Sequence, residues 1–483
     1  MSSEKHSMKP FYITTTLPYV NSDPHVGFAM EIIRADTIAR YRRMAGQEVF
    51  FNTGTDEHGL KIYQKAFDFG EEPQEYVDRY VKRFKGLRET LGLSEDIHFI
   101  RTTDPHHVAA AREFWNRCNA NGFIYTKKYK ARYCVGCELE RTDSEIENGR
   151  CFLHPHLELQ IIEEENYFFR FSAFGEKLLD LYEKNPRFVI PDFRLNEIRM
   201  FVKRGLEDFS ISRLKSKMPW GIEVPGDPDH VMYVWFDALV NYISTLGWPD
   251  TEGDFKKFWV EGETVQYAGK DNLRQQAAMW QAMLMAAGLP TTKQIVIEGF
   301  VTGAGGIKMS KSLGNTINPL DVVSEFGTDA LRYYVSRELH PFEDGPFTME
   351  KFKESYNANL ANGLGNLTSR ILKMAASNDI RLEVREGALF EPNPHLDAYD
   401  IKSYCDEIWK EIGALDKSIQ KDEPFKAIKT DKKKGEAQIR ALLGGLFGVA
   451  RKLEPVMPST SLTIQTLIRE NKMPEKPLFA RRD

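Results

Sequence analysis

Strand-like and helix-like patterns of apolar residues alternate in the first quarter of the chain. A β-branched and aromatic run at 11–16 predicts a buried strand, and turn-forming residues follow it. Apolar residues then recur at helical spacing over 25–44, until Gly46 ends the pattern. A second strand is predicted at 49–52, before another helical segment. Strands that alternate with helices at this spacing predict a parallel sheet with right-handed crossovers.

The alternation breaks near residue 125 and returns about 100 residues later. Residues 126–225 contain short predicted strands and a cysteine cluster, so we interpret them as an insertion. Strand-like runs reappear at 232–237, 265–267 and 295–297. From residue 357 onward the apolar spacing is helical, with segments at 359–374, 399–420 and 437–453. The pattern predicts an α/β domain that is split by the insertion and followed by an all-α region.

Composition indicates an ordinary globular protein. The chain has 483 residues, too many for one core, and it is 42% hydrophobic and 28% charged. No stretch approaches the roughly 20 apolar residues of a membrane helix, and the first ten residues lack an apolar signal core. We therefore expect a cytoplasmic protein that does not associate with membranes. The net charge of −5 excludes a global basic field for nucleic acid.

The cysteines point to a metal site. Their number is five, and an odd count without a signal peptide disfavours a disulfide framework. Cys134, Cys137, Cys151 and His154 form two paired hooks, each with two intervening residues. This spacing predicts tetrahedral structural zinc with four protein ligands and no open position. One alternative is that Cys134 and Cys137 form a redox pair. The other is that His156 takes the place of His154 as a zinc ligand.

Two further segments suggest phosphate chemistry. His25 and Gly27 open the first predicted helix directly after the first strand, where backbone N–H groups attract anions. Lys308 and Lys311 follow a glycine-rich segment, and two ammonium groups on such a loop suit a polyphosphate transition state. A helix cap and a solvated surface loop are the ordinary alternatives for these two segments.

Together these motifs resemble a known family. The segment 25–28, His-Val-Gly-Phe, resembles the HIGH element of class I aminoacyl-tRNA synthetases, and 308–312 is identical to their KMSKS loop. The segments 16–19, 54–59 and 233–238 narrow the resemblance to methionyl-tRNA synthetases. It extends from about Lys9 to the C-terminus. The implied reaction activates methionine with ATP and Mg²⁺, and then transfers the methionyl group to tRNA(Met).

The resemblance also implies a domain organisation: an α/β, Rossmann-like catalytic domain, split by a zinc-bearing insertion, precedes a C-terminal all-α helical bundle. The expected segments are 9–125 and 226–318 for the two catalytic halves, 126–225 for the insertion, 319–360 for a linker that contacts the tRNA stem, and 361–483 for anticodon binding. Because the insertion is shorter than known editing domains, rejection of homocysteine is expected at the synthetic site. Since the chain ends without an appended dimerising domain, a monomer is expected.

The resemblance assigns roles to individual residues. The expected ATP-binding residues are His25, Gly27, Arg213, Gly269, Asp271, Lys308 and Lys311, with His25 and both lysines also catalytic and Lys311 the main transition-state lysine. The expected methionine-binding residues are Leu17, Tyr19, Asp56, Trp235, Ala238, Tyr242 and Gln276. A thioether lacks strong hydrogen-bonding groups, so selection by shape and sulfur–aromatic contact fits this set. The expected anticodon-binding residues are Asn366, Arg370 and Phe425.

Three positions depart from the family pattern. Phe28 replaces the last histidine of HIGH, Gln276 stands where many relatives have a histidine near the methionine sulfur, and Phe425 replaces a stacking tryptophan. Two alternative functions therefore stay open at this point. One is a non-catalytic tRNA-binding paralogue, and the other is a class I synthetase for another amino acid.

Overall fold

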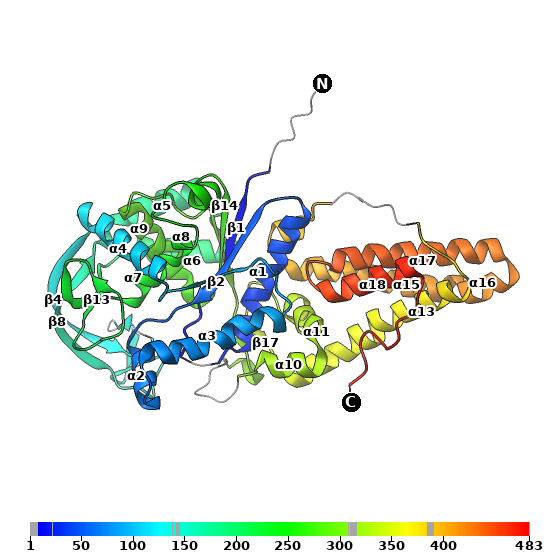
Figure 1. Ribbon diagram of the computed structural model, residues 1–483, viewed down its shortest axis with the longest axis horizontal. Coiled ribbons are helices and arrows are strands. Elements are labelled where there is room, and N and C mark those ends of the chain that lie inside the picture. Colours follow the sequence, from blue (N-terminus) through cyan, green and yellow to red (C-terminus); the bar gives the residue numbers. More distant parts are fainter. Residues whose placement is uncertain are drawn as a thin grey trace, which may run out of the picture. The chain divides into compact units, whose positions relative to one another are not determined.

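The structure, a computed structural model, describes residues 8–21, 23–137, 139–141, 145–307, 309, 316–383 and 391–482. The chain divides into two compact units, each assembled from segments that are distant in sequence. The first unit comprises Met1–Asp23, Phe50–Lys85 and Asp96–Ile297, and the second comprises Pro24–Val49, Gly86–Glu95 and Glu298–Asp483. Figure 1 colours both units along the sequence.

A six-stranded sheet forms the centre of the first unit, in the order β3-β2-β1-β14-β15-β9 (Figure 1). Its strands are β1 (Phe11–Thr14), β2 (Val49–Thr55), β3 (His98–Arg101), β9 (Val189–Ile190), β14 (Glu263–Gly269) and β15 (Gln294–Glu298). The pairs β1–β14, β2–β3 and β15–β9 are parallel. The predicted parallel α/β sheet is confirmed. Because β1 has strands of the N-terminal segment on one side and β14 on the other, a topological switch point lies between β1 and β14.

Aromatic side chains fill the core beside this sheet. Trp115, Trp248, Trp259 and Trp280 are almost completely buried in one continuous cluster. The ring of Phe114 stacks on that of Trp280 at 5.6 Å between centroids. Large aromatic surfaces of this kind dominate core energetics. The helices and helical turns of this unit are α2 (Leu60–Phe69), α3 (Pro73–Thr90), α4 (Pro105–Ala120), η2 (Phe171–Phe174), α5 (Gly175–Lys184), α6 (Asp192–Lys203), α7 (Val234–Ala238), α8 (Asn241–Ser244), η3 (Phe255–Val260), η4 (Lys270–Asn272), η5 (Gln275–Met279) and α9 (Trp280–Ala286).

The segment predicted to contain short strands contains them, and it also contains a long antiparallel pair. Strand β4 (Ile124–Cys134) pairs with β8 (Gln160–Phe169) along almost its whole length. The prediction did not include the length of this pair, along which charged side chains face each other, as in the 3.3 Å contact between Lys130 and Glu163. The shorter strands are β5 (Leu139–Glu140), β6 (Ile146–Glu147), β7 (Arg150–Cys151), β10 (Phe209–Ser210), β11 (Ser212–Leu214), β12 (Glu223–Val224) and β13 (Asp227–Met232). Strand β9 of the same segment joins the central sheet.

The run at 232–237 is a second correction. Strand β13 ends at Met232, and helix α7 begins at Val234. The N–H groups of Phe236 and Asp237 both donate to the carbonyl of Tyr233, which closes a helical turn. A short apolar run cannot distinguish a strand from a buried helix, and this ambiguity caused the error. Trp235 therefore lies on a helix and not at a strand end.

The second unit is mainly helical. The predicted helix at 25–44 is confirmed as α1 (Val26–Met44). The long helices α13, α15, α17 and α18 pack against one another, which confirms the predicted C-terminal bundle (Figure 1). The remaining elements are β16 (Val301–Thr302), η6 (Ala304–Gly306), α10 (Pro319–Phe326), α11 (Thr328–Tyr333), η8 (Tyr334–Glu338), β17 (Gly345–Pro346), α12 (Met349–Ser355), η9 (Tyr356–Gly365), α13 (Asn366–Ser377), α14 (Pro394–Asp397), α15 (Ile401–Asp422), α16 (Pro424–Thr430), α17 (Lys432–Leu453) and α18 (Pro458–Glu470). No helix in the described ranges has both the length and the apolar character needed to cross a membrane.

Buried charges fix α1 inside the second unit. The guanidinium of Arg34 lies 3.2 Å from the carboxylate of Glu298, and both side chains are almost completely buried. Two residues further along α1, Asp36 forms a 2.9 Å ion pair with Arg332, again without solvent exposure. Arg34 also donates to the carbonyls of Val335 and Leu339. A buried charge is tolerated when it has an ion-pair partner and its remaining hydrogen bonds are made, as these charges have.

Candidate functional site

A cavity lies beyond the carboxyl ends of the central strands of the first unit. It is lined by Thr16, Leu17, Asp56, Trp235, Ala238, Leu239, Asn241, Tyr242, Asn272, Gln275 and Gln276. Leu17 follows β1, Asp56 follows β2, and Asn272 follows β14. Ligands of open α/β sheets bind at this edge, beside the switch point. The structure therefore brings together six of the seven residues expected around methionine, with Tyr19 the exception.

One helical face supplies much of the cavity wall. Trp235, Ala238, Leu239 and Tyr242 recur at helical spacing through α7 and the turn into α8, and all four line the cavity. The sequence prediction missed Leu239 because it placed 232–237 in a strand, where successive side chains point to opposite faces. A helical interpretation of the same residues is the signal that could have found it. Gln275 was also missed, although it precedes Gln276 on η5 and faces the same cavity.

Tyr19 supports the cavity from outside. It forms an isolated parallel bridge with Asp56, and its hydroxyl donates a 2.6 Å hydrogen bond to the carbonyl of His58. The N–H of Asp56 donates to the carbonyl of Pro18 at 3.0 Å. Tyr19 therefore holds the loop that carries Asp56. The Asp56 carboxyl group is 6% exposed and faces the cavity, an arrangement that favours a cationic ligand group.

A buried carboxylate between two histidines underlies this wall. Oδ2 of Asp237 lies 3.1 Å from Nδ1 of His58, and Oδ1 lies 3.7 Å from Nε2 of His107. Burial alone would raise the pKa of Asp237, but the charges and hydrogen bonds of the two histidines outweigh it and hold the pKa below its usual value. An ionised carboxylate only accepts hydrogen bonds, so Nδ1 of His58 donates to it. His107 forms a further 3.0 Å hydrogen bond with the hydroxyl of Ser244.

Three of the residues expected at the nucleotide, Gly269, Asp271 and Arg213, belong to the first unit. Gly269 ends β14, and a Cβ atom there would lie 3.0 Å from Oδ1 of Asp271. Arg213 lies instead on β11, where its guanidinium stands 4.8 Å from the ring centroid of Tyr233 and donates to the hydroxyl of Ser210 at 2.8 Å. Gly269 and Asp271 therefore lie in the segment that leads into the cavity-lining Asn272, whereas the Arg213 guanidinium is hydrogen-bonded to Ser210 of β10.

His25 caps α1 in the second unit. Its Nδ1 accepts a 3.1 Å hydrogen bond from the N–H of Gly27, so in the neutral ring the hydrogen is on Nε2. A Cβ atom on Gly27 would lie 2.8 Å from Cε1 of His25, so a larger residue there would require the imidazole to shift. The N–H of Val26 donates to the carbonyl of Ile317 at 3.0 Å. The first N–H groups of α1 are therefore occupied within the unit. Lys308 and Lys311 lie outside the described residues, and Met309 between them is buried.

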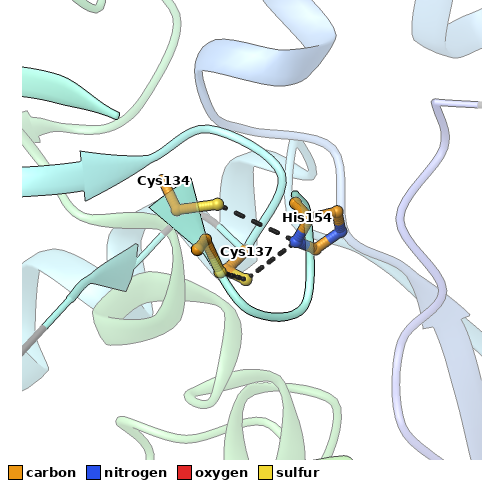
Figure 2. A group of neighbouring side chains, drawn as sticks. Cys134, Cys137 and His154 are labelled. Atoms are coloured by element: carbon orange, nitrogen blue, oxygen red, sulfur yellow. Dashed lines mark hydrogen bonds between the residues drawn. The ribbon is translucent and has the colours of Figure 1, made fainter. Parts of the chain in front are cut away.

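The predicted metal-ligand cluster comes together in space. The ligand atoms of Cys134, Cys137, Cys151 and His154 all lie within 4.8 Å of one another. Sγ of Cys137 is 3.6 Å from Sγ of Cys151 and 3.0 Å from Nδ1 of His154. Figure 2 shows Cys134 and Cys137 pointing toward the His154 ring. Tetrahedral zinc with ordinary bond lengths separates two sulfurs by about 3.8 Å, so the spacing fits such an ion. The cluster uses His154 and not the alternative His156.

The surroundings of the cluster are tightly packed. A Cβ atom on Gly136 would lie 2.6 Å from Cγ of His154, so the loop requires glycine against the imidazole. The carbonyl of Gly136 accepts a 3.0 Å hydrogen bond from Nζ of Lys61. Burial, opposed in part by the guanidinium of Arg141, raises the pKa of the Cys137 thiol to about 12.

The residues expected at an anticodon lie on two helices of the bundle. Asn366 begins α13 and is exposed, and Arg370 one turn later forms an ion pair with Asp416 of α15. Phe425 lies on α16 and is 44% exposed. Exposed large aromatic side chains of this kind can stack on a base. No interaction in the described part of the chain joins Phe425 to either of the other two.

Comparison with known proteins gives the class. A sequence model of the family described as tRNA synthetases class I (M) matches residues 11–159 and 141–372. Together with the parallel sheet, its switch-point cavity and the Cys-rich insertion, this match defines a class I aminoacyl-tRNA synthetase.

Individual relatives narrow the class. A methionine–tRNA ligase of Thermotoga maritima is 38% identical over 97% of this chain and 76% of its own length. One of Brucella suis is 44% identical over 77% of this chain and 72% of its own length. A solved methionyl-tRNA synthetase of Mycobacterium tuberculosis, in complex with methionyl-adenylate, matches with a TM-score of 0.90 at 35% identity, over 98% of this chain and 100% of that one. The chain therefore belongs to the methionine–tRNA ligase family of aminoacyl-tRNA ligases. These matches confirm the predicted resemblance and give no support to a non-catalytic paralogue or to another amino acid.

Proposed function

We propose that the chain activates methionine with ATP in the cavity beside β1 and β14, and transfers the methionyl group to tRNA(Met). The observation that carries this proposal is the composition of the cavity. A buried carboxylate, Asp56, faces a wall that contains Trp235 and Tyr242. A carboxylate suits the α-ammonium group of an amino acid, and aromatic rings suit a thioether.

The proposed residue roles follow from this placement. Leu17, Trp235, Ala238, Tyr242 and Gln276 enclose the methionine side chain, and Tyr19 holds the Asp56 loop. On the nucleotide side, Gly269 and Asp271 take the ribose, while Gly27 and Arg213 complete the expected ATP-binding set. A carboxylate accepts two O–H hydrogen bonds, which suits a ribose diol.

The chemistry is a displacement at phosphorus followed by acyl transfer. A carboxylate oxygen of methionine attacks the α-phosphorus of ATP, and pyrophosphate leaves with the electron pair of the broken P–O bond. A hydroxyl oxygen of the terminal tRNA adenosine then attacks the carbonyl carbon, the bond from this carbon to the AMP oxygen breaks with its electron pair left on AMP, and the hydroxyl proton is released. Such steps depend on positioning and charge stabilisation. His25 donates through Nε2–H, and Lys308 and Lys311 supply positive charge to the phosphates. Mg²⁺ bound with ATP would neutralise part of the phosphate charge.

We propose zinc as the ion of the cysteine cluster, with a structural role. Three thiolates and one imidazole are a donor set that zinc prefers, and four protein ligands leave no position for a substrate. Metal analysis of the purified chain should find about one zinc ion per chain. A zinc content far below this value would contradict the assignment.

For the second unit we propose contact with tRNA. We assign Asn366 and Arg370 to the edges of anticodon bases, and Phe425 to stacking on an anticodon base. The expected domain boundaries are part of this proposal. Replacing Phe425 by Ala should weaken tRNA(Met) binding about ten-fold without changing methionine activation. A cytoplasmic location and a monomeric state stay predictions.

Methionine-dependent exchange of pyrophosphate into ATP tests the main proposal. The chain should exchange with methionine, and Lys311→Ala should lower the exchange rate far more than the affinity for methionine. Asp56→Asn should instead raise the KM for methionine, because the amide lacks the charge that pairs with the ammonium group. Absence of exchange with methionine would refute the proposal. Exchange with a different amino acid would show that the chain activates that amino acid and not methionine.

A further inference from the structure

The short loop that carries Asp56 is held by hydrogen bonds from several directions. It spans residues 56–59 and connects β2 to α2. The backbone carbonyls of its four residues all accept a hydrogen bond; in chain order the donors are the N–H of Val20, the indole Nε1–H of Trp220, the hydroxyl of Tyr19 and the N–H of Tyr63. Backbone groups outside regular structure need such partners. The place of the Asp56 carboxylate therefore depends on how its loop is held.

Trp220, in the connection between β11 and β12, binds this loop at two points. Its indole Nε1–H donates to the carbonyl of Glu57 at 2.6 Å, and its own carbonyl accepts from the N–H of Gly59 at 3.2 Å. These two points lie on either side of His58, whose ring centroid is 5.5 Å from that of Trp220. Trp220 therefore holds the backbone of residues 57–59 from outside the central sheet.

His58 joins the same loop to a wall of the cavity. Its Nδ1 lies 3.1 Å from Oδ2 of Asp237, which belongs to α7 together with Trp235. Asp56 and Trp235 both line the cavity. A shift of the loop would therefore change the position of the Asp56 carboxylate relative to the side chains of α7.

The other anchors of the loop are part of the core, whereas Trp220 is not. The carboxylate of Glu57 is fully buried and forms a 2.8 Å ion pair with Arg101, and its N–H donates to the hydroxyl of Thr102 at 2.9 Å. Trp220, by contrast, is only partly buried. Partly exposed side chains contribute less to stability than fully buried ones. Trp220 is therefore the anchor whose loss can alter the loop without unfolding the unit.

We propose that Trp220 is a positioning residue for amino-acid activation: its two hydrogen bonds hold residues 56–59 so that the Asp56 carboxylate meets the α-ammonium group of the substrate. This inference rests on the proposed function. A charge-assisted hydrogen bond to a carboxylate depends on distance and direction, so a small displacement of the loop weakens it. Because Trp220 acts through this loop, its loss should affect the binding of the amino acid and not that of ATP.

A tryptophan elsewhere in the same unit gives a matched test. Trp220→Phe removes the indole N–H and keeps an aromatic ring beside His58. Trp259→Phe is the control, because Nε1 of Trp259 also donates to a backbone carbonyl, that of Pro290 at 2.9 Å, and Trp259 is not among the residues that line the cavity. Pyrophosphate exchange gives kcat and the KM values for methionine and ATP.

Trp220→Phe should raise the KM for methionine about five-fold, the loss expected from one neutral hydrogen bond. The KM for ATP and kcat should change by less than about two-fold. Trp259→Phe should leave both KM values unchanged. A KM for methionine that is the same in Trp220→Phe as in the unaltered chain would overturn the inference, and so would equal increases in both KM values.

A double-mutant cycle tests whether Trp220 acts through Asp56. In Asp56→Asn the KM for methionine is already raised, because the charge that pairs with the ammonium group is gone. Adding Trp220→Phe should then raise this KM by less than about two-fold, since no carboxylate remains to be positioned. The same five-fold increase in both backgrounds would overturn the inference.

The outcomes separate a positioning role from a structural one. With a merely structural role, fewer molecules would be folded, so kcat would fall while both KM values stayed the same; that result overturns the inference while the proposed function stands. If thermal unfolding shows that Trp220→Phe does not fold, Trp220→Tyr, which also lacks the indole N–H, carries the same test. Absence of methionine-dependent exchange in the unaltered chain would overturn the inference together with the proposed function.

Discussion

Replacing Asp237 by Asn should destabilise the first unit by removing a buried charge from between two histidines. The carboxylate has no solvent exposure and lies 3.1 Å from His58 and 3.7 Å from His107. Hydrogen bonds to charged groups contribute about 1.5–3 kcal/mol, and one of the two contacts is at hydrogen-bonding distance, so we expect a loss of about 2 kcal/mol. For a unit of this size the melting temperature should fall by about 4 °C.

The loss should depend on pH in one direction. His58 and His107 hold the pKa of Asp237 below its ordinary value, although burial opposes them. Because the folded pKa is below the unfolded value of about 3.9, the carboxylate stabilises the fold above that pH. This contribution is lost as the pH falls through the folded pKa. The difference in unfolding free energy between the unaltered chain and Asp237→Asn should therefore be smaller at about pH 3.5 than at about pH 7.5.

Urea unfolding monitored by tryptophan fluorescence measures this difference. Every tryptophan except Trp409 belongs to the first unit, so the signal reports mainly on that unit. Asp180→Asn is the control, because Asp180 forms only an exposed ion pair with Lys184 and should cost less than about 0.5 kcal/mol. A loss for Asp237→Asn no larger than for the control would refute the reasoning. So would a loss that is the same at both pH values.

Three further substitutions test other parts of the chain. Gly27→Ala places a Cβ atom 2.8 Å from the capping imidazole, and it should lower kcat/KM for ATP in pyrophosphate exchange about ten-fold. Gly448→Ala is the control, because a Cβ atom there meets open space, and it should leave kcat/KM unchanged. Arg34→Met leaves Glu298 buried without its ion-pair partner and should cost about 3–5 kcal/mol in urea unfolding; a cost below 1 kcal/mol, roughly that of a surface pair, would contradict the buried pairing. Cys137→Ser should reduce the zinc content and the melting temperature together, and a variant that keeps a full complement of zinc would argue against the cluster.

The parts of the structure that could be predicted are those with a local signal. Helix α1 follows from apolar residues at helical spacing and from a glycine stop, and the four ligands of the metal cluster follow from two paired hooks in the sequence. The helix α7 was missed because five apolar and aromatic residues in succession have no distinguishing period. This one error also concealed Leu239, which belongs to the same helical face as Trp235.

The buried hydrogen bond between Thr292 and Gln266 shows why the rest could not be predicted. Along β14 the polar residues Thr264 and Gln266 alternate with the apolar residues Val265 and Tyr267, a pattern that ordinarily predicts a strand with one face in solvent. In the structure both faces are covered, and Gln266 is 1% exposed. The partner that makes this burial tolerable, Thr292, is 26 residues away in sequence and shows no pattern of its own. Alternation predicts which side chains share a face, but only the assembled sheet decides whether that face meets water. A buried polar face is therefore a property of the fold.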